Sequence, residues 1–127
     1  MNDRKSGNRK LIITKSLKDV MVFYEFLGDK YDMIAPHSET YIFTDTLLDY
    51  LYKKYDEIII IYDFDLAGVS GVNKLRKRNP EKFSYLFVST QRILINGKVK
   101  IIDKDISDFS VDRSDDEIRE KLKLMGL

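Results

Sequence analysis

The sequence predicts an α/β fold, a doubly wound sheet of about four mainly parallel strands flanked by helices. Short apolar runs of strand length alternate with longer stretches whose apolar residues recur at helical spacing. One run, within residues 57–62, is apolar and β-branched without interruption, which is typical of a strand buried on both faces of a parallel sheet. Such alternation implies crossover connections and helices on both sides of the sheet.

The first half of the chain carries clear helix boundaries. Ser16 can cap a helix that Gly28 ends, and apolar residues such as Phe23 and Leu27 share one face of it. The elements expected in this half are a strand at 11–14, a helix at 16–28, a strand at 33–35, a helix at 41–52 and a strand at 57–62.

The second half adds a turn signal. Asn96-Gly97 between two apolar runs is typical of a two-residue β-hairpin, and Ser114 with Glu117 forms a capping box before the last helix. Asn79-Pro80 stops the expected helix at 66–78. The expected elements are a helix at 66–78, a strand at 85–88, a possible extra hairpin near 93–102 and a helix at 114–125.

Length and composition indicate one ordinary globular domain. We expect a basic, flexible tail at 1–10 and a single domain at 11–127, because 127 residues suit one core. Apolar residues are 43% and charged residues 34%, as in soluble proteins. The longest apolar run is strand-sized and the polar start is unlike a secretory signal, so we expect no membrane association and a cytoplasmic location.

The residue inventory restricts any metal to oxygen ligands. The chain has no cysteine, which excludes disulfides, thiolate catalysis and cysteine-bound zinc or iron–sulfur clusters. The single histidine, His37, cannot build a multi-histidine site, and we assign it no catalytic role. Magnesium, manganese or calcium are the metals that such a chain favours.

Two carboxylates follow the most buried expected strand. If the backbone stays extended through Phe64, the side chains of Asp63 and Asp65 point to the same side. Two carboxylates about 4 Å apart repel by roughly 4 kcal/mol at an effective dielectric near 20, which a divalent cation or a proton relieves. The alternative is that Asp65 only caps the next helix.

Other acids follow neighbouring strands. Each has an ordinary explanation as a turn or cap residue, for example Asp19 at the third position of its helix. Because doubly wound topology gathers the carboxyl ends of parallel strands at one edge, we expect these acids to lie together. They are Asp19, Glu39, Asp63, Asp65, Asp105 and Asp108.

The net charge of +1 exerts no general attraction on polyanions. Basic residues cluster within 4–10 and within 74–78, and such runs are most often solvated faces. Contact with nucleic acid is the alternative.

Three blocks resemble the Toprim family, which is shared by primases, type IA and II topoisomerases and several nucleases. They are LIITKSLKDVM, IIIIYDFDLAG and KDISDF, and the resemblance covers roughly residues 11 to 109. The middle block is the most specific, since primase-like members have an apolar strand, DxD and then Ala-Gly at a helix start. TKSLKD with a downstream HSE is similar to the Toprim region of phage-encoded primases and primase–helicases.

The resemblance implies the site residues. Asp63 and Asp65 would bind Mg²⁺ or Mn²⁺, with Asp105, Asp108 and Asp19 contributing directly or through water. The residues expected to contact nucleotide or nucleic-acid phosphates are Lys15, Lys18, Lys74, Arg76, Lys77, Arg78 and Lys104.

One position departs from the family. Lys15 stands where the family usually has a glutamate that acts as general acid or base. A protonated lysine cannot bind magnesium, and loss of a general base costs about 10²- to 10⁴-fold in rate. Three interpretations compete. In the first, Lys15 binds a phosphate; in the second, Glu39 supplies the missing carboxylate; in the third, catalysis is lost and the domain only binds nucleic acid. We favour the first two together.

The resemblance therefore predicts Mg²⁺-dependent phosphoryl transfer on nucleic acid by a primase-type nucleotidyltransferase. The expected partners are DNA or RNA, nucleotide triphosphates and a replicative helicase or other primase subunits, in the host cytoplasm if the protein is phage-encoded. The alternatives are a metal-dependent nuclease of the same fold, and a catalytically degenerate module that binds nucleic acid or replication proteins.

Overall fold

Strands and helices alternate along the chain as far as residue 86, in the order that the sequence predicts. The computed structural model describes residues 9–36, 43–63, 65–78, 81, 83–89, 92–103 and 105–127. The elements are β1 (Lys10–Thr14), α1 (Leu17–Leu27), β2 (Asp32–Ile34), α2 (Asp45–Lys54), β3 (Glu57–Ile61), α3 (Leu66–Arg78), β4 (Phe83–Leu86), β5 (Arg92–Ile95), β6 (Lys98–Ile101), α4 (Ile106–Ser110) and α5 (Asp115–Leu124).

Four parallel strands form the central sheet, in the order β2-β1-β3-β4. β1 and β3 lie in the middle and pair along their whole length, from Lys10 opposite Glu57 to Thr14 opposite Ile61. The run 58–61 is buried throughout, as its uninterrupted apolar sequence predicts. The expected α/β class is therefore confirmed.

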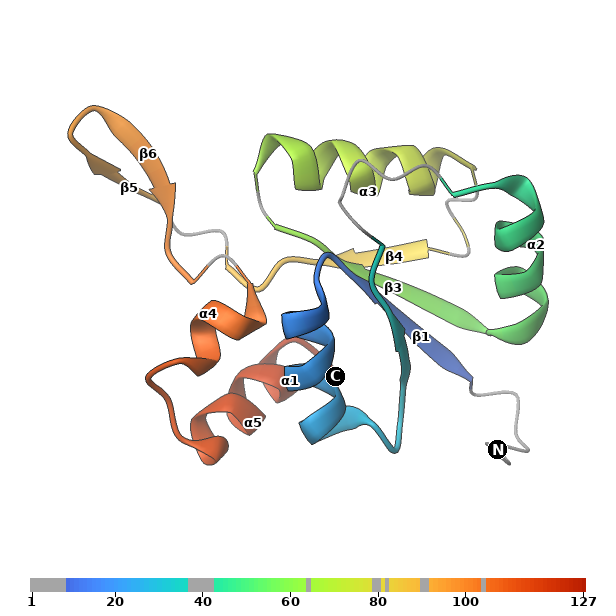
Figure 1. The fold of residues 1–127 in the computed structure, drawn as a ribbon, viewed down its shortest axis with the longest axis horizontal. Coiled ribbons are helices and arrows are strands. Elements are labelled where there is room, and N and C mark those ends of the chain that lie inside the picture. Colours follow the sequence, from blue (N-terminus) through green and yellow to red (C-terminus); the bar gives the residue numbers. More distant parts are fainter. Residues whose placement is uncertain are drawn as a thin grey trace.

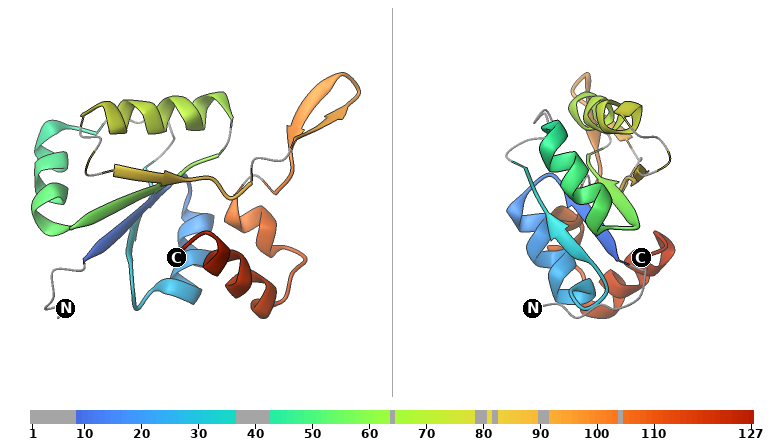
Figure 2. Two further views of the ribbon diagram at one scale, coloured as in Figure 1. Left: turned by 180° about the vertical axis from the view of Figure 1, so that it is seen from behind. Right: turned by 90° about the vertical axis from the view of Figure 1, so that its right-hand side faces the viewer.

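Helices cover both faces of this sheet, so there are two cores (Figures 1 and 2). Side chains alternate along β3 because successive residues of a strand point to opposite faces. Ile58 and Ile60 pack with buried residues of α2 and α3. Ile59 and Ile61 pack with buried residues of α1, α4 and α5. The doubly wound arrangement follows directly.

The expected helix caps are present at two ends. The Ser16 hydroxyl accepts a hydrogen bond from the Asp19 amide at the start of α1. At α5, Ser114 and Glu117 form the reciprocal capping box that the sequence predicts. These hydrogen bonds satisfy backbone N–H groups that lack partners within the helix.

Two elements differ from the sequence predictions by two residues or more, and one helix was not expected. The second helix begins at Asp45, after the cap Thr44, rather than at 41, and Tyr41 and Ile42 lie outside the described residues. The fourth strand is β4, at Phe83–Leu86 rather than 85–88, because the buried Phe83 pairs with Ile58. α4 was not expected, and Asp105 caps it by accepting from the Asp108 amide.

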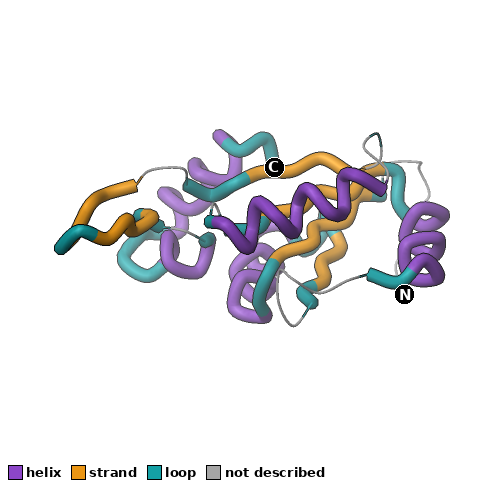
Figure 3. Tube along the Cα trace, turned by 90° about the horizontal axis from the view of Figure 1, so that it is seen from above, coloured by secondary structure: helices purple, strands orange, loops and turns teal. Residues whose placement is uncertain are grey.

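The β5–β6 hairpin projects from one end of the molecule, with α2 at the other (Figures 1 and 3). Its two strands pair only with each other in the described structure, and residues 93–100 are all exposed. Asn96 and Gly97 have φ angles of 50° and 77°, the left-handed pair that a tight hairpin turn needs. The expected hairpin is confirmed.

No helix in the described part of the chain has the length and apolar character needed to cross a membrane.

Candidate functional site

The polar residues that follow β1 and β3 meet where the topology of the sheet changes direction. After β1 the chain enters α1 on one face, and after β3 it enters α3 on the other. β1 and β3 are neighbours, so their carboxyl ends flank the crevice in which doubly wound folds commonly bind ligands. Lys15 follows β1 directly, and Asp63 follows β3 after Tyr62.

Lys15 lies between two buried carboxylates. Its Nζ is 2.8 Å from Oδ2 of Asp105 and 3.5 Å from Oδ2 of Asp63. The side chain of Lys15 is 22% exposed, whereas those of Asp63 and Asp105 are 5% and 9% exposed. One ammonium therefore pairs with acids from two segments that are far apart in sequence.

The charges of this cluster shift its pKa values in directions that follow from the contacts. Burial alone would lower the pKa of Lys15, but the hydrogen bond to Asp105 and the charges of Asp63, Asp105 and Asp19 raise it above its ordinary value. Burial would raise the pKa of Asp105, but Lys15 and the hydrogen bonds from Asp108 and Ser107 lower it. Lys15 is thus cationic and Asp105 anionic at neutral pH.

Asp19 belongs to the same edge and is 1% exposed. Its carboxylate accepts a hydrogen bond from the Ser107 amide at 3.2 Å and one from the Thr14 hydroxyl at 3.4 Å. Burial and the charge of Asp105 raise the pKa of Asp19, against the opposing effect of the hydrogen bonds. Its side chain therefore joins three segments, a role that its third position in α1 did not reveal.

Asp65 uses its carboxylate to begin α3. Its Oδ1 accepts from the Gly68 amide at 2.8 Å, and its carbonyl oxygen accepts from the Val69 amide at 2.9 Å. This is the capping alternative considered for Asp65 from the sequence. The same turn brings Gly68 against the backbone of Asp63, so closely that a Cβ atom at 68 would collide with the Asp63 carbonyl oxygen.

The remaining residues expected at the site are placed as follows. Asp108 is exposed in the first turn of α4, and Lys18 is exposed in the first turn of α1. Glu39, Lys104, His37 and Phe64 lie outside the described residues, as does the tail up to residue 8. The sequence did not indicate Thr14 or the Ser107 amide, although an aspartate such as Asp105 is a common cap at a helix start.

The basic end of α3 lies at the opposite edge of the sheet. α3 starts near Asp63 and runs for 13 residues, about 20 Å. Near its end, Arg76 Nε donates to the carbonyl of Phe83 at the start of β4. Arg78 donates to the Phe43 carbonyl and forms an ion pair with Asp45.

Two residues of this basic end have structural contacts, and two are open to solvent. The guanidinium of Arg76 also lies 5.0 Å from the centre of the Tyr85 ring. Lys74 and Lys77 are exposed. The basic residues at the end of α3 therefore do not form one surface with the Lys15 cluster.

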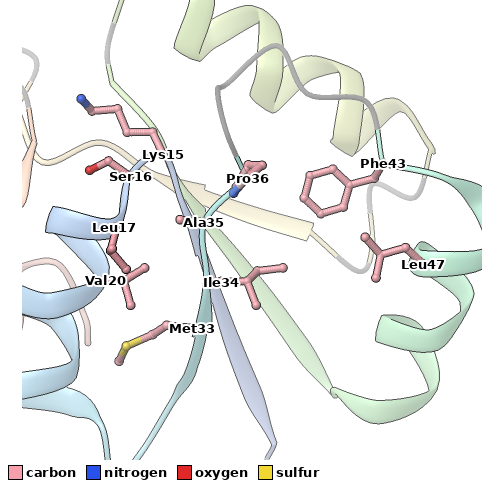
Figure 4. A pocket seen from close by; sticks show the side chains of 10 residues that line it. All are labelled: Lys15, Ser16, Leu17, Val20, Met33, Ile34, Ala35, Pro36, Phe43 and Leu47. Atoms are coloured by element: carbon pink, nitrogen blue, oxygen red, sulfur yellow. The ribbon is translucent and has the colours of Figure 1, made fainter.

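A cavity of about 780 Å³ adjoins Lys15 (Figure 4). Most of its lining is apolar and comes from α1, from β2 and the two residues after it, and from Phe43 and Leu47 around the start of α2. The ammonium of Lys15 points away from Phe43 and Leu47, so the charged cluster lies outside the apolar part of the cavity (Figure 4).

The donors of this edge suit a hard cation. Among the described residues, no three acidic, histidine or cysteine side chains surround a common point. Magnesium needs fewer, because it binds through one or two carboxylates with water and substrate phosphate completing its shell. Asp63 and Asp105 provide two carboxylates that already share one cation, the Lys15 ammonium. They fit a divalent cation if Lys15 withdraws.

Fold and site together define an α/β protein with a charged cluster at its topological switch point. The structure is similar to the crystal structure of the primase fragment of the bacteriophage T7 primase–helicase protein, with a TM-score of 0.58 and 19% sequence identity. The match covers 91% of this chain and 44% of that chain, so this chain spans less than half of the fragment. No family model and no curated protein matches the sequence. The likeness shows a primase-like fold.

Proposed function

We propose that the chain is the Toprim domain of a phage-type DNA primase, which takes part in Mg²⁺-dependent transfer of nucleotides to nucleic acid. The observation that carries the proposal is the pairing of Asp63 and Asp105 around one cation at the carboxyl ends of the sheet. The fold likeness to a primase fragment supports it, as do the family-like blocks around the same residues.

In this proposal Asp63 and Asp105 hold the metal, Mg²⁺ or Mn²⁺. When bound, the metal would polarise a phosphate oxygen of the nucleotide. Asp65 orders the start of α3 through the Gly68 amide, and Asp19 holds α4, which carries Asp105, against α1. Lys15, released from the carboxylates, would bind a phosphate oxygen of the substrate.

Metal binding tests the site without requiring the remaining parts of a primase. Titration of Mn²⁺, followed by its electron paramagnetic resonance signal, should show one site that weakens at least tenfold in Asp63→Asn and in Asp105→Asn. The control is Asp112→Asn, which changes an exposed acid in the turn after α4. Equal affinity in all four proteins would refute the assignment of the metal site.

A second candidate is a domain that has lost catalysis and only binds nucleic acid. Two observations favour it. The Lys15 ammonium lies between Asp63 and Asp105, where a metal would otherwise bind, and Asp65 acts as a helix cap. Labelled single-stranded DNA and nucleotides, with and without magnesium, separate the candidates in the full-length protein. Extension of a primer supports the primase, shortening of the DNA supports a nuclease, and unchanged bound DNA supports the binding module.

A further inference from the structure

We propose that Lys15 is a built-in counter-ion that competes with the divalent cation for Asp63 and Asp105, so that the metal binds well only together with an anion that takes over Lys15. The inference rests on the proposed function, because it concerns the same metal site. It assigns to Lys15 the control of when that site is open, a role distinct from catalysis.

Competition follows from the space between the two carboxylates. The ammonium approaches Oδ2 of Asp105 to 2.8 Å and Oδ2 of Asp63 to 3.5 Å. Magnesium binds carboxylate oxygens at about 2.0–2.1 Å, so a metal held by the same two carboxylates would need the space that the ammonium fills. The two cations therefore exclude each other.

Burial makes this competition strong. Both carboxylates are at most 9% exposed, and charges at this depth are screened less than those at the surface. Removal of one partner from a buried pair leaves the other charge uncompensated. The ammonium thus stabilises the acidic edge in the absence of metal, and a metal has to displace it.

The released lysine explains the need for an anion. Its side chain is 22% exposed, so the ammonium can move toward solvent without a rearrangement of the core. An anion beside the metal, such as a phosphate group, would pair with Lys15 and offset the loss of its two acids. Metal and anion should therefore increase each other's affinity, because each favours the same withdrawn position of Lys15.

Neutral substitutions of Lys15 test the competition directly. We expect Lys15→Met and Lys15→Gln to bind Mn²⁺ roughly 10- to 100-fold more tightly than the wild type, since a positive charge beside the ligands is gone. Lys15→Arg keeps the charge and should stay near wild-type affinity. Lys30→Met, which changes an exposed lysine in the turn after α1, is the matched control and should also stay near it.

Thermal unfolding gives a second readout that is independent of activity. Without metal, Lys15→Gln should melt below the wild type, and Mn²⁺ should raise its melting temperature by more than that of the wild type. Sulfate, compared with chloride at equal ionic strength, should tighten Mn²⁺ binding by the wild type and leave Lys15→Gln unchanged.

The outcomes separate this inference from the proposed function. If the wild type and both neutral variants bind Mn²⁺ with equal affinity, the competition is refuted and the metal site stands. If none of them binds Mn²⁺ and Asp63→Asn changes nothing, the proposed function itself fails. If the neutral variants alone bind Mn²⁺ tightly, the competition is supported.

Discussion

The carboxylate of Asp19 in α1 accepts a hydrogen bond from the backbone amide of Ser107 in α4, 3.2 Å away across 88 residues of sequence. The Thr14 hydroxyl at the end of β1 donates to its other oxygen. A single buried side chain thus fixes α4, and with it Asp105, relative to the central strand β1. The geometry of the candidate site depends on this long-range contact.

Substitutions of Asp19 should separate its hydrogen bonds from its charge. We expect Asp19→Ala to lower the free energy of unfolding by about 1–3 kcal/mol, because the half-buried Ser107 amide loses its acceptor. Asp19→Asn should lose less, since its amide oxygen can still accept from the Ser107 amide and its NH2 group can donate to the Thr14 hydroxyl oxygen. The folded state also disfavours the charged form of Asp19. Urea denaturation at neutral pH measures both. Equal losses would show that the hydrogen bonds do not matter.

The stability contributed by Asp105 should depend on pH. Its pKa in the folded protein lies below the ordinary value of 3.8, so its contribution is complete above about pH 3.8 and is lost as the pH falls through the lowered value. The stability difference between the wild type and Asp105→Asn should therefore be constant from pH 7 to about pH 5 and shrink at pH 3. Urea denaturation across this range tests it. A difference that grows on acidification would reverse the assigned sign.

Gly68 should tolerate no side chain. A methyl group there would meet the Asp63 carbonyl oxygen, so Gly68→Ala has to move the turn between β3 and α3. We expect a loss of about 2–3 kcal/mol and weaker Mn²⁺ binding, since overpacking shifts the backbone that carries Asp63. Ala67→Ser, at an exposed neighbouring position, is the control and should cost less than about 1 kcal/mol. A wild-type melting curve for Gly68→Ala would contradict the close approach.

The exposed lysines of α3 should affect nucleic-acid binding without affecting metal binding. Lys74 and Lys77 lie in the half of α3 that leads away from Asp63, so Lys74→Glu with Lys77→Glu should leave Mn²⁺ affinity unchanged. If this helix contacts DNA, the double variant should bind single-stranded DNA more weakly and with a smaller dependence on salt. Lys53→Glu in α2 is the control. Equal DNA binding by all three proteins would exclude α3 as a contact surface.

Most of the fold was predictable because local signals and tertiary structure agree. The apolar run 58–61, the capping box at Ser114 and the turn at Asn96-Gly97 each occur where the sequence predicts them. β4 was misplaced by two residues because the polar Ser84 interrupts its apolar pattern, while the buried Phe83 determines where pairing begins. α4 has five residues, too few for a helical apolar repeat to reveal it, and the hydrogen bonds of Asp105 and Asp19 fix its start.

The candidate site was only partly predictable. The sequence places Lys15, Asp63 and Asp105 after strands, and parallel topology brings such residues to one edge. It does not reveal that one ammonium spans both acids, because that contact depends on the register of β1 with β3 and on the docking of α4. For Asp65 the sequence left a ligand and a cap as alternatives, and the described structure shows the cap.

The two apolar faces of β3 have a consequence for strand alignment. In a sheet with one wet face, a shift by one residue exposes apolar side chains, which fixes the pairing. Here Ile58 to Ile61 would meet an apolar layer on either side, so the hydrophobic pattern alone penalises such a shift only through poorer packing. A one-residue shift would, however, move Asp63 by about 3.3 Å along the strand and turn its side chain to the other face, away from Lys15. The ion pair of Asp63 with Lys15 thus favours one register of β3. The residues proposed for chemistry therefore also help to specify the fold.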